Sequence, residues 1–148
     1  MQVLIVEDNV FNAFCLSRIF EVTYKQVQVT VANKSHTAMK QFEKISPALV
    51  ILDGDLGADK GRSWNGPALA DILWEKYPHV PVVAWTDCEQ MRSNFADVFK
   101  RHNKAINEYN NWAKVVCPIH IHQSIAYLTA EFNYSTTPPL SIAQHFYA

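Results

Sequence analysis

Two kinds of apolar pattern alternate along this 148-residue chain, and the alternation constrains the fold more than any other feature of the sequence. Short continuous apolar runs, typical of strands that are buried on both faces, occur at residues 3–6, 48–52 and 80–85. Between these runs, apolar residues recur every three or four positions, which is the period of a helix with one buried face. The pattern therefore predicts strands and helices in regular alternation.

Five strand–helix units can be placed in this way. The second strand is predicted around residues 27–31, where valines alternate with polar residues, and the fifth at residues 113–117. Pro67 suits a first helical turn, whereas Pro47 and Pro78 end the helices before them. The residues predicted to face the core from the five helices are Phe11, Cys15 and Ile19; Ala38, Phe42 and Ile45; Leu69, Ile72 and Leu73; Met91, Phe95, Val98 and Phe99; and Ile121, Ile125, Leu128 and Phe132.

Alternating strands and helices form a parallel sheet with helices on both faces, because each crossover between parallel strands is right-handed. Five strands are too few to close an eight-stranded barrel. We therefore predict an α/β fold of the flavodoxin-like (βα)5 type, a three-layer sandwich whose parallel five-stranded sheet has the order 2-1-3-4-5. In this order, ligands bind at the carboxyl ends of strands 1 and 3, where the winding of the sheet reverses.

Charge and cysteine content narrow the class of protein further. The formal net charge of −1 gives no broad basic field for nucleic acid or an anionic membrane. The three cysteines, Cys15, Cys88 and Cys117, are odd in number and widely spaced, which argues against a disulfide framework or a zinc site and favours small buried side chains in a reducing compartment. No export signal or stretch of 18 apolar residues is evident. We expect a cytoplasmic domain that contacts neither nucleic acid nor membrane.

Acidic residues end two strands that this topology brings side by side. Glu7 and Asp8 follow the first strand, and Asp53 ends the third, with Asp55 on the rim of the same crevice. Two carboxylates about 5 Å apart repel by roughly 3 kcal/mol at an effective dielectric of about 20, so a cluster needs a compensating charge. A hard divalent cation such as Mg²⁺ binds through a few oxygens and keeps positions open for phosphate. This interpretation is preferred to solvated loop carboxylates.

These motifs together resemble the receiver domain of response regulators, the phospho-acceptor module of two-component signalling. The acidic pair stands in VLIVEDN, an aspartate ends strand 3 in LVILDGDLG, and a threonine ends strand 4 in VPVVAWTD. The resemblance implies that Asp53 is phosphorylated and that Thr86 donates a hydrogen bond to the phosphoryl group. It also implies a Mg²⁺ site made by Glu7, Asp8, Asp53 and the main-chain carbonyl of Asp55.

One position departs from the family pattern. Receivers usually carry a lysine directly before a proline at the end of strand 5, but AKVVCP places Cys117 before Pro118. Lys114 stands three residues earlier, and the alternation of side chains along a strand predicts that it points to the other face. We therefore expect an atypical receiver that lacks the strand-5 lysine and has Cys117 in its place.

The resemblance covers roughly residues 1–132 and implies a signalling domain, not an enzyme. Its partners would be a histidine kinase or phosphotransfer protein as phosphodonor and an unnamed downstream protein reached by protein–protein contact. A homodimer of this chain is also possible on the sequence alone. Residues 133–148 are expected to form a tail, either a short docking helix or disordered chain, because Pro138-Pro139 breaks any helix there.

Two alternative functions stay open at this point. The first is a pseudo-receiver, in which the same fold binds a protein partner without phosphorylation. The second, more remote, is a haloacid dehalogenase-type phosphatase, since Asp53-Gly54-Asp55 fits the Asp-x-Asp motif of that class. The phosphatase reading leaves the acidic pair at residues 7 and 8 unexplained.

Overall fold

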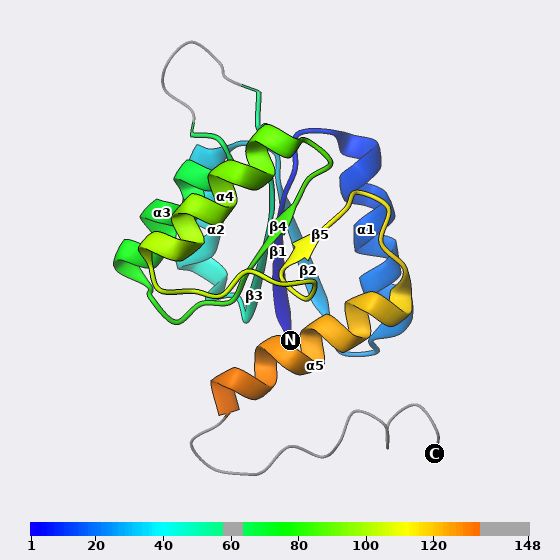
Figure 1. Ribbon diagram of the computed structural model, residues 1–148. Helices are drawn as coiled ribbons and strands as arrows, with labels where there is room; N and C mark the ends of the chain where they lie inside the picture. The colour runs from blue at the N-terminus through cyan, green and yellow to red at the C-terminus, as the bar shows by residue number, and fades with distance from the viewer. Residues whose placement is uncertain (58–63, 134–148) are drawn as a thin grey trace.

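Five parallel strands form one sheet in the order β2-β1-β3-β4-β5 in the computed structural model, which describes residues 1–57 and 64–133 (Figure 1). The predicted fold class and strand order are confirmed. The elements are β1 (Gln2–Val6), α1 (Val10–Thr23), β2 (Gln28–Ala32), α2 (Ser35–Ile45), β3 (Leu49–Asp53), α3 (Gly66–Lys76), β4 (Val82–Trp85), α4 (Glu89–Arg101), β5 (Asn111–Trp112) and α5 (Pro118–Asn133).

Two hydrophobic cores lie on the two faces of the sheet. Helices α2, α3 and α4 cover one face, and α1 and α5 cover the other (Figure 1). Successive side chains of the central strands alternate between the cores: Val50 and Leu52 of β3 pack under α2–α4, whereas Leu49 and Ile51 pack under α1 and α5. Burial on both faces explains why the sequences of these strands are continuous apolar runs.

The register of the sheet sets the position of the acidic residues. Val6 of β1 pairs with Leu52 of β3, so Glu7 comes level with Asp53 just beyond the last pair. Asp53 in turn pairs with Trp85 of β4, and Thr86 follows directly. The residues singled out on strands 1, 3 and 4 therefore meet at one edge of the sheet.

Helix α1 has the predicted period but buries a different face. Its buried residues are Ala13, Leu16 and Phe20. The prediction that Phe11 and Cys15 face the core is wrong, since Phe11 is 72% exposed and Cys15 is exposed as well. Apolar residues occur on all sides of this helix, so periodicity alone does not select the side that packs. The prediction that all three cysteines are buried is also wrong, because each is exposed.

Strand β5 is shorter and lies earlier than predicted. It consists of Asn111–Trp112 alone, and the segment expected to be a strand, residues 113–117, follows it as irregular chain. Trp112 is buried, whereas Val115 is 94% exposed. The apolar residues of AKVV therefore do not form the strand: the buried Trp112 before them pairs with β4, and of the two valines only Val116 packs, partly buried, against the core.

No helix within residues 1–57 and 64–133 is long and apolar enough to cross a membrane. The expected tail lies outside the described residues from position 134 onward.

Candidate functional site

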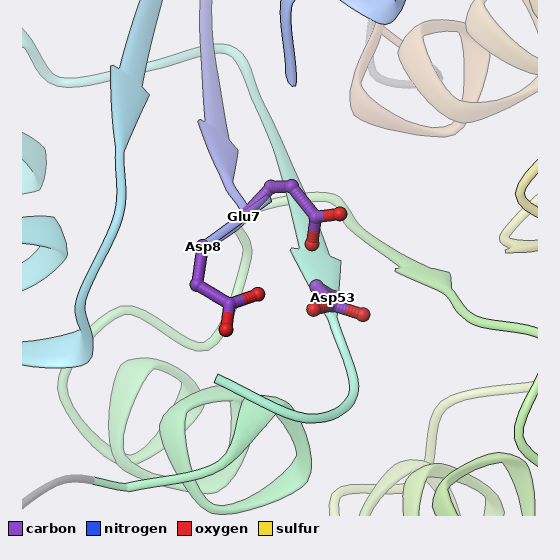
Figure 2. A group of neighbouring side chains, drawn as sticks. All are labelled: Glu7, Asp8 and Asp53. Carbon is purple, nitrogen blue, oxygen red and sulfur yellow. The ribbon is translucent and has the colours of Figure 1, made fainter. Parts of the chain in front are cut away.

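Three carboxylates converge at the carboxyl ends of β1 and β3. Glu7 and Asp8 follow β1 and Asp53 ends β3, and Figure 2 shows their side chains extending into the same space. One ligand oxygen from each residue can be chosen so that all three oxygens lie within 4.8 Å of one another. The convergence predicted from the sequence is thus present in the structure.

The three carboxylates differ in their burial, and the pKa values of Glu7 and Asp8 are raised. Glu7 is 2% exposed and Asp53 is 7% exposed, whereas Asp8 lies at the surface. Burial, followed by a hydrogen bond with Asp53, raises the pKa of Glu7 from its ordinary value to about 7. Burial and the neighbouring charge of Asp53 also raise the pKa of Asp8. The site therefore opposes the accumulation of negative charge, which favours a bound cation.

The first turn of α1 supports Glu7. Asn9 caps the helix by accepting a hydrogen bond from the backbone N–H of Asn12 at 2.9 Å. The amide Nδ2 of Asn12 donates to Glu7 Oε1, also at 2.9 Å. Sequence reasoning missed Asn12, although its position in the first turn after the acidic pair was a usable signal.

Lys114 enters the site and forms ion pairs with both buried carboxylates. Its Nζ lies 2.8 Å from Asp53 Oδ1 and 3.1 Å from Glu7 Oε2. The prediction that Lys114 points to the other face is wrong, because it rested on strand alternation and the chain has left β5 after Trp112. The backbone N–H of Lys114, beyond the end of β5, donates to the side chain of Asp87, at Oδ1, over 2.9 Å.

Cys117 is exposed and stands directly before α5, where its carbonyl accepts the N–H of Ile121 at 3.1 Å. The residue before Pro118 is a cysteine, as the sequence shows, so the departure from the family pattern at this position stands, but a lysine does reach the site. Lys114 brings an ammonium group to Asp53 from three residues earlier.

Thr86 and two glycines close the site on the sides of β4 and α3. Thr86 is buried, and its Oγ1 accepts the backbone N–H of Cys88 at 3.1 Å. A Cβ atom at Gly54 would come within 3.1 Å of Thr86 Oγ1, so Thr86 lies directly beside the residue after Asp53. A Cβ atom at Gly66 would overlap the backbone carbonyl of Asp53, which explains why α3 starts with a glycine there.

Asp55 follows Asp53 by two residues, close enough for its charge to act on Asp8. Its side chain is exposed and its Oδ1 accepts the backbone N–H of Gly57 at 3.1 Å. Its charge contributes to the raised pKa of Asp8. Within the described residues, the group of converging carboxylates comprises Glu7, Asp8 and Asp53 without the side chain of Asp55.

The donor set fits a hard divalent cation. Carboxylate oxygens are the protein ligands that Mg²⁺ prefers, and Mg²⁺ commonly keeps several waters beside one or two carboxylates. One exposed and two buried carboxylates supply these oxygens here, and the exposed position of Asp8 leaves one side of the group open to solvent.

A family model for the response regulator receiver domain matches residues 3–105. The chain belongs to this family. Response regulator receiver domains are signalling modules of two-component systems, and the acidic pocket of Glu7, Asp8 and Asp53 is consistent with the phospho-acceptor site of such a module. No curated protein sequence matches the chain.

Solved structures share the receiver fold at low sequence identity. The receiver domain of NtrX from Brucella abortus is 21% identical, with a TM-score of 0.65, and the match covers 91% of this chain and 99% of that one. A CheY-like receiver domain protein from Methanospirillum hungatei is 16% identical, with a TM-score of 0.73, over 91% and 98% of the two chains. A longer NtrX chain from Brucella abortus is 17% identical, with a TM-score of 0.71, over 97% of this chain. This chain therefore covers only 32% of the length of that longer chain.

Proposed function

We propose that this receiver domain accepts a phosphoryl group on Asp53 in a Mg²⁺-dependent reaction and signals by contact with another protein. The observation that supports this most strongly is the surrounding of Asp53: two further carboxylates converge on it, and the ammonium of Lys114 lies 2.8 Å from its Oδ1. A nucleophilic carboxylate, a cation site and a fixed positive charge are the parts that phosphoryl transfer to an aspartate requires.

The transfer forms one bond and breaks one. A carboxylate oxygen of Asp53 attacks the phosphorus of the donor and forms an acyl phosphate. The P–N bond of a phosphohistidine donor breaks, and the imidazole nitrogen keeps the electron pair and takes up a proton. With a small donor such as acetyl phosphate, the P–O bond breaks and acetate leaves.

The residues around Asp53 have separate roles in this proposal. Glu7, Asp8, Asp53 and the main-chain carbonyl of Asp55 would hold Mg²⁺, which neutralises charge on the nucleophile and the phosphoryl oxygens when bound. Thr86 would turn its hydroxyl to donate a hydrogen bond to a phosphoryl oxygen.

The role of the usual strand-5 lysine is assigned to Lys114 in this proposal. Cys117 was expected in that place, but it is exposed just before α5, and a thiol carries no positive charge. The Lys114 ammonium, by contrast, already contacts the acceptor carboxylate. A charge-assisted hydrogen bond contributes about 1.5–3 kcal/mol, so the difference between an ammonium and a thiol is large.

The phosphodonor in this proposal is a histidine kinase or a phosphotransfer protein in the cytoplasm, and the output is contact with a downstream protein. Direct binding to nucleic acid or to a membrane is not part of the proposal, because the net charge of −1 offers no general attraction to polyanions.

Intact-mass analysis after incubation with acetyl phosphate and Mg²⁺ tests the proposal. We expect one phosphoryl adduct on the wild-type protein, and none on Asp53→Asn or after Mg²⁺ is removed with EDTA. A wild-type protein that stays unmodified under conditions in which another receiver is phosphorylated would instead support the pseudo-receiver reading, in which the acidic site only binds a partner.

A further inference from the structure

The position of Lys114 raises the question of what keeps its side chain over the acidic site. Lys114 lies in irregular chain between β5 and α5, so no strand alternation fixes its direction. A lysine also loses more rotamer freedom on ordering than most side chains. The ordered position therefore needs specific contacts beyond the attraction of two carboxylates.

Trp85 supplies contacts at both ends of Lys114. The indole Nε1–H of Trp85 donates to the backbone carbonyl of Lys114 at 3.2 Å. The Lys114 Nζ lies 4.0 Å from the centroid of the Trp85 ring, within the range of a cation–π contact. The carboxylate of Asp87 adds a third anchor by accepting the Lys114 N–H at 2.9 Å.

Trp85 is itself held rigidly. Its side chain belongs to the core under α1 and α5, and the residue is 2% exposed. It pairs in the sheet with Asp53 on one side and with Trp112 on the other. The ring that carries the lysine is thus fixed to the same strand pair as the acceptor aspartate.

We propose that Trp85 is a positioning residue that holds the Lys114 ammonium in place for phosphorylation of Asp53. The inference rests on the proposed function, and it assigns to Trp85 a role that an aliphatic core residue could not take. A leucine would fill part of the volume, but it offers neither an N–H for the Lys114 carbonyl nor a ring face for the ammonium. A phenylalanine offers only the ring.

A spectroscopic measurement tests the geometry without phosphorylation. A proton above an aromatic ring is shifted upfield, so we expect upfield-shifted side-chain protons for Lys114 in NMR spectra of the wild-type protein. The shift should persist in Trp85→Phe, disappear in Trp85→Leu, and be unchanged in Trp112→Phe. Trp112 is a matched control because it is equally buried in the neighbouring strand, yet its Nε1 donates to Tyr109 and Ser124.

A double-mutant cycle tests the functional role. We expect Trp85→Leu to slow the reaction with acetyl phosphate about tenfold, as a lost cation–π contact and backbone anchor allow. In the Lys114→Gln background the same substitution should slow it less than about twofold, because the group that Trp85 positions is already gone. Trp112→Phe should leave the rate unchanged. Amide spectra of each variant establish that it is folded, and Trp85→Phe replaces Trp85→Leu if the latter unfolds, with a smaller loss expected in the same cycle.

The NMR measurement and the double-mutant cycle together distinguish failure of this inference from failure of the proposed function. Equal effects of the Trp85 substitution with and without Lys114 would overturn the inference, since Trp85 would then act only as core. Absence of the upfield shift in the wild-type protein, or its persistence in Trp85→Leu, would overturn it too. If the wild-type protein is not phosphorylated at all, the proposed function fails, and the NMR arm alone decides whether Trp85 positions Lys114.

Discussion

At the scale of single residues, one ammonium group contacts both buried carboxylates of the site. Lys114 contacts both Asp53 and Glu7, whereas Cys117 is exposed at the start of α5. We therefore expect Lys114→Gln to slow phosphorylation by acetyl phosphate about ten- to a hundredfold, the equivalent of one charged hydrogen bond, and Cys117→Ser to leave it unchanged. Initial rates by intact mass measure both. If Cys117→Ser slows phosphorylation and Lys114→Gln does not, Cys117 and not Lys114 acts at the phosphoryl site.

The proton on Glu7 predicts how stability changes with pH when no divalent cation is present. The pKa of Glu7 is raised by burial to about 7, above its ordinary value of 4.5. The folded protein then binds more protons than the unfolded chain between these values, so the free energy of unfolding should fall as pH rises from about 4.5 to 7. Urea denaturation in EDTA should show this fall in the wild-type protein and a flatter profile in Glu7→Gln. Parallel profiles would contradict the assigned environment of Glu7.

Binding of Mg²⁺ should depend on the same carboxylates. We expect Asp8→Asn and Asp53→Asn each to weaken Mg²⁺ binding by about tenfold or more, because each removes a charged oxygen ligand. Tryptophan fluorescence provides the titration signal, since Trp85 lies under Lys114 beside the site. Asp97→Asn, which removes an exposed carboxylate on α4, is the matched control. An affinity that none of the three substitutions changes would place the ion elsewhere.

At the scale of elements, sequence patterns predicted whether a segment is a strand or a helix better than they predicted its buried face or its end residues. Continuous apolar runs correctly located β1 and β3, because burial on both faces leaves few alternatives for such runs. In α1 the period was correct but the face was not, because apolar side chains surround the helix and tertiary packing selects Leu16 and Phe20. Two valines after Trp112 suggested a strand where the chain is irregular.

The assigned face of α1 can be tested by stability. Leu16 is buried, whereas Phe14, two residues earlier, is 61% exposed. Leu16→Ala should lower the free energy of unfolding by about 2–5 kcal/mol, and Phe14→Ala should change it by less than about 1 kcal/mol. Urea denaturation of the two variants measures both effects. A larger loss in Phe14→Ala would mean that the opposite face of α1 packs on the sheet.

At the scale of the whole molecule, topology accounts for most of the site that the sequence could predict. Glu7, Asp8 and Asp53 follow or end regular strands, so the strand order and register bring them together wherever the loops go. Lys114 could not be placed in this way. It lies in irregular chain, and its contacts are with Trp85, Asp87 and two carboxylates that are distant in sequence. Residues fixed by strand ends were predictable, and a residue fixed by several tertiary contacts was not.

Chemical mapping of the phosphorylated residue tests the central claim most directly. An acyl phosphate is reduced by borohydride to the alcohol with loss of phosphate, which converts the modified aspartate to homoserine. After treatment with acetyl phosphate and Mg²⁺, reduction and peptide mass mapping should locate homoserine at position 53 in the wild-type protein. Asp53→Asn treated in the same way should yield none. Homoserine at Asp8 or Asp55 with Asp53 intact, or a phosphorylated protein that resists reduction, would contradict the account of Asp53 as the acceptor.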